Sequence, residues 1–352
     1  MKYLVLATLL AACGSVSNQN DAGTGTADAC VAETIEELCG TASCEPQTFT
    51  DRCGQTREVD CGACDAGLGC VVGTCKTPVC ASFNFSVATL PAFSRTSPEI
   101  EDTLGAVTPD GSVVVTVPTT APSTCGNYGV VISDEVAVGS GTYTGQDITT
   151  KLMGKTFIGQ DGWAITSDGL TLIARAPDSK KFVQLTRSAK KLSDFTTAVE
   201  GPFTEINAAL PASSIMFAPV ISADGLEFLY TINTSPPSGT PTNSIYSAVR
   251  ASTTDPFPVG TKLGAPLTDY AYASALSSDR LTVFVFDNFS GRVFTRTSTT
   301  GAWVNPNAPA PAPLLGGWQQ KPLANCQRMF AMGNAAGVGG CLREDILLLT
   351  RQ

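Results

Sequence analysis

Residues 221–231 read ISADGLEFLYT, and this pattern recurs along the chain. An apolar approach leads into an Asp-Gly pair, the strongest short signal for a β-hairpin turn, and a strand with apolar residues at every second position follows. Similar segments begin at residues 107 (VTPDGSVVVTV), 165 (ITSDGLTLIAR) and 276 (LSSDRLTVFVF). Aspartate bonds to its own turn backbone and glycine tolerates a positive φ, so these residues are predicted to build turns rather than a site. They are Asp110, Gly111, Asp168, Gly169, Asp224, Gly225 and Asp279.

The spacing of these motifs predicts a repeat protein. Successive aspartates are separated by 58, 56 and 55 residues, and a weaker fifth copy, PLANCQRMFAM, places Asn325 at the aspartate position. A fixed period of this length fits the four-stranded blade of a β-propeller. Gly, Pro, Thr and β-branched residues dominate without a helical period, so the fold class is predicted to be all-β. Five motifs favour five blades over residues 82–352, and a six-bladed ring with one degenerate blade is the alternative.

The last blade is predicted to close the ring with a strand from the start of this region. The chain ends on DILLLTRQ, a third strand with nothing left for a fourth, and SFNFSVATL from Ser82 precedes the first motif. Pairing the two would hide strand edges that otherwise invite aggregation. Arg187, Arg250 and Arg351 end equivalent strands and are interpreted as structural partners of turn carbonyls or carboxylates. With these motifs the region resembles the WD-like propeller repeats of bacterial envelope proteins, including the propeller of the Tol translocation system.

Composition excludes several classes of function. Among 352 residues, 22 Lys and Arg stand against 31 Asp and Glu, and the net charge of -9 offers no footing for a nucleic-acid backbone. The chain has no histidine, which excludes Ser-His-Asp and Cys-His nucleophile systems and histidine-ligated zinc. Neither a cofactor nor a metal is predicted, and a monomer is expected.

The first residues, MKYLVLATLLAACGS, predict export. The apolar run from Leu4 to Leu10 is too short to cross a bilayer, which needs about 20 apolar residues. The sequence LAAC, ending at Cys13, resembles the lipobox of bacterial lipoproteins, in which the signal is cut before a cysteine that carries the acyl chains. The resemblance implies a signal peptide over residues 1–12 and a lipidated polar tether over residues 13–29, attached to the outer membrane or cell surface of a Gram-negative bacterium. The alternative is an ordinary secretory signal with an incidental cysteine.

Twelve further cysteines, an even number, predict disulfides in an exported chain. Nine of them fall within residues 30–80, a Gly-rich module with little apolar material, in which covalent bridges would supply the stability that a core cannot. The module loosely resembles the short Cys-Gly repeat modules at the start of exported bacterial surface proteins. The twelve are Cys30, Cys39, Cys44, Cys53, Cys61, Cys64, Cys70, Cys75, Cys80, Cys125, Cys326 and Cys341.

The pairing of these cysteines is not fixed by their spacing. The simplest arrangement keeps four bridges among the first eight, and joins Cys80 to Cys125 and Cys326 to Cys341. The alternative for Cys61 and Cys64 is half a zinc site or a redox pair, but neither a second pair nor a strand-helix setting accompanies them.

Acidic residues shortly before three of the motifs are the candidate ligands at the central channel. They are Glu101, Asp102, Asp161 and Asp269. Carboxylates that converge there would bind a metal ion or act as general acid and base on a glycosidic bond. The favoured interpretation is that they cap turns or stay solvated, because no spacing in the sequence fixes their separation.

A binding or interaction scaffold is the favoured function, contacting protein or glycan through the propeller face. The alternative is a carbohydrate-active hydrolase or lyase that uses the channel carboxylates, and a third hypothesis gives binding to the Cys-rich module. Large aromatic residues would stack on sugars in the glycan hypotheses, although packing between blades is favoured for them. They are Trp163, Trp303, Trp318, Tyr230 and Tyr246.

Overall fold

The computed structural model of this chain describes part of the Cys-rich module and most strands of the repeat region. The described residues are 33–40, 43–44, 46–62, 69–71, 74–76, 80, 85–89, 100–120, 130–136, 142–148, 151, 162–176, 180–190, 195–234, 242–267, 272–287, 290–305, 320–323, 326, 328–333 and 345–351. Within these ranges no helix has the length and apolar character to cross a membrane.

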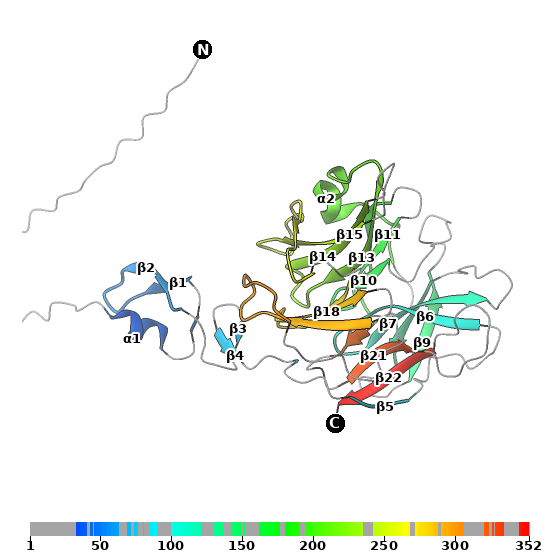
Figure 1. Ribbon diagram of the computed structural model, residues 1–352, viewed down its shortest axis with the longest axis horizontal. Coiled ribbons are helices and arrows are strands. Elements are labelled where there is room, and N and C mark those ends of the chain that lie inside the picture. Colours follow the sequence, from blue (N-terminus) through cyan, green and yellow to red (C-terminus); the bar gives the residue numbers. More distant parts are fainter. Residues whose placement is uncertain are drawn as a thin grey trace, which may run out of the picture.

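Five antiparallel sheets, called blades 1 to 5, make up the described part of the repeat region (Figure 1). Blade 1 contains β6 (Ile100–Val107), β7 (Val113–Thr120), β8 (Val131–Glu135) and β9 (Tyr143–Asp147). Blade 2 contains β10 (Trp163–Ile165), β11 (Thr171–Arg175) and β12 (Phe182–Thr186). Blade 3 contains β13 (Ser214–Ile221), β14 (Glu227–Thr234), β15 (Thr242–Val249) and β16 (Thr261–Lys262). Blade 4 contains β17 (Tyr272–Leu276), β18 (Thr282–Asp287) and β19 (Ser290–Thr295).

Blade 5 closes the ring as the sequence predicts. It contains β20 (Gln320–Pro322), β21 (Arg328–Gly333), β22 (Asp345–Arg351) and, as its outer strand, β5 (Phe85–Thr89). Figure 1 shows β5 beside β22 at the C-terminus, and the register joins Arg351 to Phe85. The first strands follow one another in space in the order β6, β10, β13, β17 and β20, and β22 packs against β6. The last blade therefore contacts the first, and the sheets form a five-membered ring.

The turn after each first strand has the geometry that the Asp-Gly motif predicts. In blade 3, Ser222 Oγ donates to Asp224 Oδ1 at 2.5 Å, and the backbone N–H of Leu226 donates to the same carboxylate oxygen at 3.0 Å. The residue after the aspartate has a positive φ in every copy, from 49° to 76°. The five residues at this left-handed position are Gly111, Gly169, Gly225, Arg280 and Cys326. The two departures from glycine therefore keep the same turn, which confirms the fifth copy.

In the four turns with an aspartate, the Oδ1 atom of that aspartate accepts hydrogen bonds from within the turn. In blade 1, Asp110 Oδ1 accepts from Thr108 Oγ1 at 2.6 Å and from the backbone N–H of Ser112 at 3.0 Å. Burial by itself raises the pKa of Asp110, but these hydrogen bonds outweigh it and hold the pKa below its ordinary value. These hydrogen bonds support the turn role predicted for the repeated aspartates.

The first strands of blades 1, 3 and 4 each carry a β-bulge. The register shifts between Leu104 and Ala106 in β6, between Phe217 and Val220 in β13, and at Ser274 in β17. A bulge bends its strand and increases the twist, which suits a strand that lines a ring. At the β6 bulge a Cβ on Gly105 would lie 3.1 Å from the indole of Trp163 in the next blade, a tight contact that a larger residue could make only if the indole shifted.

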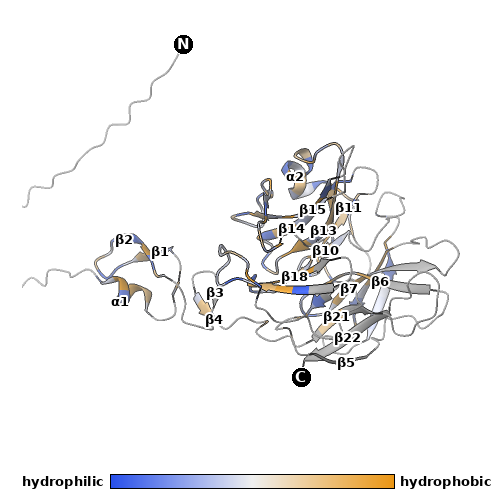
Figure 2. Ribbon diagram, viewed as in Figure 1, coloured by the Kyte–Doolittle hydropathy of each residue, from blue (hydrophilic) through white to orange (hydrophobic). Residues whose placement is uncertain are grey.

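Apolar side chains fill the spaces between blades. Phe228 and Tyr230 of β14 are buried against Phe182 of blade 2, with Phe182 and Phe228 edge to face at a centroid distance of 5.3 Å. Figure 2 shows hydrophobic residues in orange within the strands of the propeller, and Val283 and Val285 of β18 pack with Trp303. Trp163 is also buried. These large aromatics pack between blades, as predicted, while Trp318 lies outside the described residues.

The Cys-rich module holds one helical turn and two hairpins. They are α1 (Ile35–Cys39), β1 (Pro46–Thr50) with β2 (Thr56–Asp60), and β3 (Gly69–Val71) with β4 (Thr74–Lys76). A capping box between Thr34 and Glu37 starts α1. In Figure 1 the second hairpin lies between α1 and the propeller. The backbone N–H of Cys70 donates to the carbonyl of Thr297 in blade 4 at 2.7 Å, so the module is joined to the ring.

The disulfides confirm a stapled module and correct one pairing. Cys39 bonds to Cys61, and Cys44 to Cys70, both within the module. Cys61 is therefore neither a zinc ligand nor a redox residue. The predicted pairs of Cys80 with Cys125 and of Cys326 with Cys341 are wrong, because Cys80 bonds to Cys326.

The physical reason for the error lies in ring closure. The expected pairs were neighbours in sequence, whereas closure places residue 80, just before β5, beside the turn of blade 5. Cys53 and Cys75 are also disulfide-bonded. Cys13, Cys30, Cys64, Cys125 and Cys341 lie outside the described residues.

Candidate functional site

The four candidate carboxylates are placed only by topology. Glu101 and Asp102 lie near the start of β6, paired in register with Thr119 and Pro118. Asp161 and Asp269 precede β10 and β17, and both lie outside the described residues. Their convergence at a channel mouth therefore stays a prediction. Among the described residues, no group of three or more Cys, Asp or Glu residues could hold a metal ion.

The channel end at the Asp-Gly turns is narrow and apolar. First strands of all five blades line a space of about 50 Å³ there, far below the roughly 300–1,000 Å³ of small-molecule sites. Its described lining includes Val107, Ile165, Val220 and Leu276 but no carboxylate. The Nζ group of Lys321 in blade 5 donates to the carbonyl of Ser274 in blade 4, across this end. The space that the described residues enclose at this end is too small for a sugar-sized ligand.

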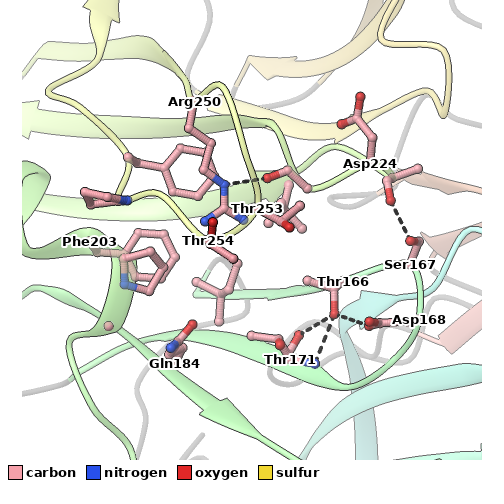
Figure 3. Close-up of a pocket in the computed structure, with 18 residues that line it drawn as sticks. Thr166, Ser167, Asp168, Thr171, Gln184, Phe203, Asp224, Arg250, Thr253 and Thr254 are labelled. Carbon is pink, nitrogen blue, oxygen red and sulfur yellow. Dashed lines mark hydrogen bonds between the residues drawn. The ribbon is translucent and has the colours of Figure 1, made fainter.

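A larger cavity, of about 580 Å³, lies between blades 2 and 3 (Figure 3). The turn of blade 2 forms one wall, and Ser167 Oγ donates across to the carbonyl of Ala223 in the turn of blade 3 at 2.5 Å. The loop after β15 and the short helix η2 (Gly201–Phe203) complete it. Sequence reasoning missed this cavity, because its walls include repeated turn residues that look alike in every blade.

The arginine after the third strand of blades 2, 3 and 4 clamps the turn of its own blade. Arg187, Arg250 and Arg296 each donate Nε–H to the carbonyl of the left-handed residue, all at 2.8 Å. Each guanidinium also stacks on an aromatic ring farther along the chain, with distances from Cζ to the ring centroid of 4.9, 4.2 and 4.3 Å. The interpretation of Arg187 and Arg250 as structural partners is confirmed for the turn carbonyls. Arg351 lies in β22, and its side chain is outside the described part of the structure.

Two of these arginines also pair with a carboxylate from the preceding blade. Arg187 binds Asp134 of blade 1 with two bonds, Nη1 to Oδ2 at 2.7 Å and Nη2 to Oδ1 at 2.6 Å. Arg296 Nη2 binds Glu227 Oε2 of blade 3 at 2.5 Å. All four side chains are buried. These ion pairs join blade 1 to blade 2 and blade 3 to blade 4.

Arg250 differs because no ion pair within the described residues occupies it. Its Nη1 donates to the backbone carbonyl of Asp255 at 2.9 Å, and its side chain lines the cavity between blades 2 and 3. Burial lowers the pKa of Arg250 and the charge of Asp255 opposes this, but a guanidinium keeps its proton at physiological pH. The cavity wall therefore presents a positive charge.

Two carboxylates, Asp224 and Asp168, also line the cavity, and within the described residues only the first is paired with a cation. Asp224 lies 3.4 Å from Nε of Arg280, which offsets its charge. Asp168 is exposed, and its Oδ1 accepts from Thr166 Oγ1 at 2.6 Å. Figure 3 shows Asp168 and Arg250 on separate walls of the cavity. The cavity thus has one cationic wall and an anionic rim.

Solved structures with a similar fold include proteins of several activities. An α-L-arabinofuranosidase from Podospora anserina, solved with cellotriose, has a TM-score of 0.50 at 10% identity, over 78% of this chain and 97% of its own. The fold is a β-propeller. A Penicillium chrysogenum α-L-arabinanase solved with arabinobiose gives 0.45 at 11% identity over 88% and 94% of the two chains, and a GH62 hydrolase with xylotriose gives 0.47 at 10% over 77% and 98%. No family model and no curated protein matches the chain.

Proposed function

We propose that this propeller is a carbohydrate-active hydrolase whose acidic residues act at the end of the channel where the first strands begin. The supporting observation is placement. Asp102, Asp161 and Asp269 stand at or just before the first strands of three different blades, and the opposite channel end has almost no space. The likeness of fold to an arabinofuranosidase solved with a glucan oligosaccharide supports a sugar as the substrate class.

The chemistry follows from the residue types available. In a chain without histidine, we assign acid and base catalysis at a glycosidic bond to carboxyl groups, the usual pair in glycosidases. One carboxylic acid would protonate the leaving oxygen, while a second carboxylate would activate water or attack the sugar carbon. The separation of the two groups decides between inversion and retention of configuration.

The test is hydrolysis by the purified full chain, measured as reducing sugar released from arabinan, arabinoxylan and cello-oligosaccharides. Replacing Asp102, Asp161 or Asp269 by asparagine is expected to lower the rate by roughly 10²-fold or more, as loss of an acid or base does. The matched control is Glu205→Gln on α2 (Thr204–Ala208). This carboxylate is exposed and is not part of the described channel lining. If no substrate is cleaved, or if the asparagine variants keep full activity, the proposal is wrong.

The second candidate function is a binding scaffold without turnover, and the cavity between blades 2 and 3 favours it. This cavity has the size of a small-molecule site and adjoins the space at the turn end of the channel, with which it shares Ser167, Ile221 and Ala223. Titration calorimetry with the same oligosaccharides separates the two functions, because a scaffold binds them and releases no product.

We also propose that Cys13 is the acylated N-terminus of the mature protein and tethers it, as a monomer, to the outer membrane or cell surface. The supporting sequence is LAAC at residues 10–13, followed by a polar stretch. Mass spectrometry of the mature chain is expected to show acyl chains on Cys13, and Cys13→Ser should release the protein from membranes. A mature chain with an unacylated Cys13, or one that begins elsewhere, contradicts this address.

A further inference from the structure

We propose that the cavity between blades 2 and 3 binds a carboxylated sugar, a uronate, whose carboxylate pairs with Nη2 of Arg250. This site is separate from the proposed catalytic end of the channel, and its occupation does not depend on hydrolysis.

The first step is a comparison of the cross-strand pair next to each turn. In blade 1 this pair is Val113 and Asp134, and Asp134 binds the arginine of the next blade. In blade 3 it is Glu227 and Val249, and Glu227 binds the arginine of the next blade. Each of these two blades thus supplies one carboxylate to its neighbour from the same place in the sheet.

Blades 2 and 4 lack this carboxylate. Their equivalent pairs are Thr171 with Thr186 and Thr282 with Thr295, and none of these residues carries a charge. Thr171 stands three residues after Asp168, where Glu227 stands three residues after Asp224. The arginine of the next blade, Arg250, faces a cavity lined by Thr171 instead of a carboxylate.

The guanidinium of Arg250 is held in the same orientation as its paired counterpart. A Cβ built on Gly225 would lie 3.6 Å from Arg250 Nη2, and one on Gly169 would lie 3.5 Å from Arg187 Nη2. In Arg187 this nitrogen binds Asp134 at 2.6 Å. In Arg250 the corresponding nitrogen has no hydrogen-bond partner among the described residues. A carboxylate that enters the cavity would meet a donor already fixed by the turn carbonyl and by stacking on Phe257.

The rest of the cavity selects the ligand class. Hydroxyl and amide groups of Thr166, Thr171, Thr253, Thr254 and Gln184 line it, and these pair with sugar hydroxyls. The exposed Asp168 at the rim would repel a second negative charge. A ligand with one carboxylate and many hydroxyls fits this arrangement better than a phosphate dianion.

The experiment is calorimetric titration of the full chain with cellobiouronate, a disaccharide with one uronate carboxylate, and with neutral cellobiose and inorganic phosphate as comparison ligands. We expect binding of cellobiouronate only. Thr171→Glu supplies the missing carboxylate, so it should pair with Arg250, raise the melting temperature and weaken uronate binding about tenfold or more relative to Thr171→Gln, which adds similar bulk without charge. Asp168→Asn should strengthen binding, because it removes the rim charge and keeps the turn acceptor.

The proposal is wrong if cellobiose or phosphate binds as tightly as cellobiouronate, if no uronate binding is detected, or if the Thr171→Glu and Thr171→Gln variants bind uronate equally. Uronate binding and melting temperature are measured independently of hydrolysis. If no hydrolysis is found, the binding proposal is still tested by these two measurements, and if no uronate binds, the catalytic proposal is still tested by the hydrolysis assay.

Discussion

The residue with a positive φ in the turn after each first strand is glycine or a residue that bonds to another part of the chain. Glycine adopts a positive φ without cost, whereas other residues lose roughly 1–2 kcal/mol there. Arg280, with φ of 61°, forms the ion pair with Asp224 of the preceding blade. Cys326, with φ of 49°, forms the disulfide to Cys80. Each strained residue therefore joins two segments that glycine could not join.

Two substitutions at residue 280 separate backbone strain from the ion pair. Arg280→Gly and Arg280→Ala both remove the contact with Asp224, and only the glycine also relieves the positive φ. We expect Arg280→Ala to unfold at lower urea than Arg280→Gly, with a difference of about 1 kcal/mol in the free energy of unfolding. Equal stability of the two variants would mean that the backbone at residue 280 carries no strain.

Tyr230 gives a prediction on alkaline stability. Burial raises its pKa to about 12, although the hydrogen bond from the N–H of Gly260 opposes this. Because the folded pKa lies above the ordinary value of 10, the contribution to stability is complete below pH of about 10 and is lost as pH rises through about 12. Absorbance titration should show one tyrosine fewer ionising late in Tyr230→Phe than in the wild type. Identical titration curves would contradict the assigned burial.

At the scale of strands and turns, sequence patterns of about ten residues predicted the features that depend only on neighbouring residues. The Asp-Gly pair with its following alternation located the hairpins, and even Arg280 at the glycine position did not hide the fourth one. The bulge beside Gly105 and the contact of Arg187 with Asp134, 53 residues away in sequence, depend on how neighbouring blades meet. The cavity beside Thr171 likewise lies between two blades, and its lining includes residues of both. The convergence of the carboxylates before the first strands stays a prediction, because it also depends on how neighbouring blades meet.

The Glu227–Arg296 pair tests the link between blades 3 and 4. Both side chains are buried, so Glu227→Gln leaves a guanidinium without its counter-charge and should lower the free energy of unfolding by about 3 kcal/mol. The exposed pair of Glu200 with Lys181, at 3.4 Å, is the matched control, and Glu200→Gln should cost less than about 1 kcal/mol. Replacing both Glu227 and Arg296 by leucine should recover much of the loss. Urea unfolding curves that show equal losses for the buried and exposed pairs would contradict this role.

At the scale of the whole molecule, the ring is closed twice by residues that precede the first blade. The strand β5 supplies the outer edge of blade 5, and the Cys80–Cys326 disulfide fixes the chain just before that strand to the turn of the same blade. The strand could be predicted because the last blade lacked one. The disulfide could not be predicted, because the spacing of cysteines along the chain does not show which turn lies next to Cys80 once the ring is closed.

The Cys80–Cys326 bond is expected to stabilise the closed ring. Digestion under non-reducing conditions should yield Cys80 and Cys326 in one linked peptide. The bond spans 246 residues, so Cys80→Ala with Cys326→Ala should lower the free energy of unfolding by about 2–4 kcal/mol, mainly by freeing the unfolded chain. The control removes Cys39 and Cys61, which enclose 22 residues inside the module, and should leave the propeller transition in place. A linked peptide that joins Cys80 to Cys125, or Cys326 to Cys341, would show that the ring closes through β5 without a covalent bond to blade 5.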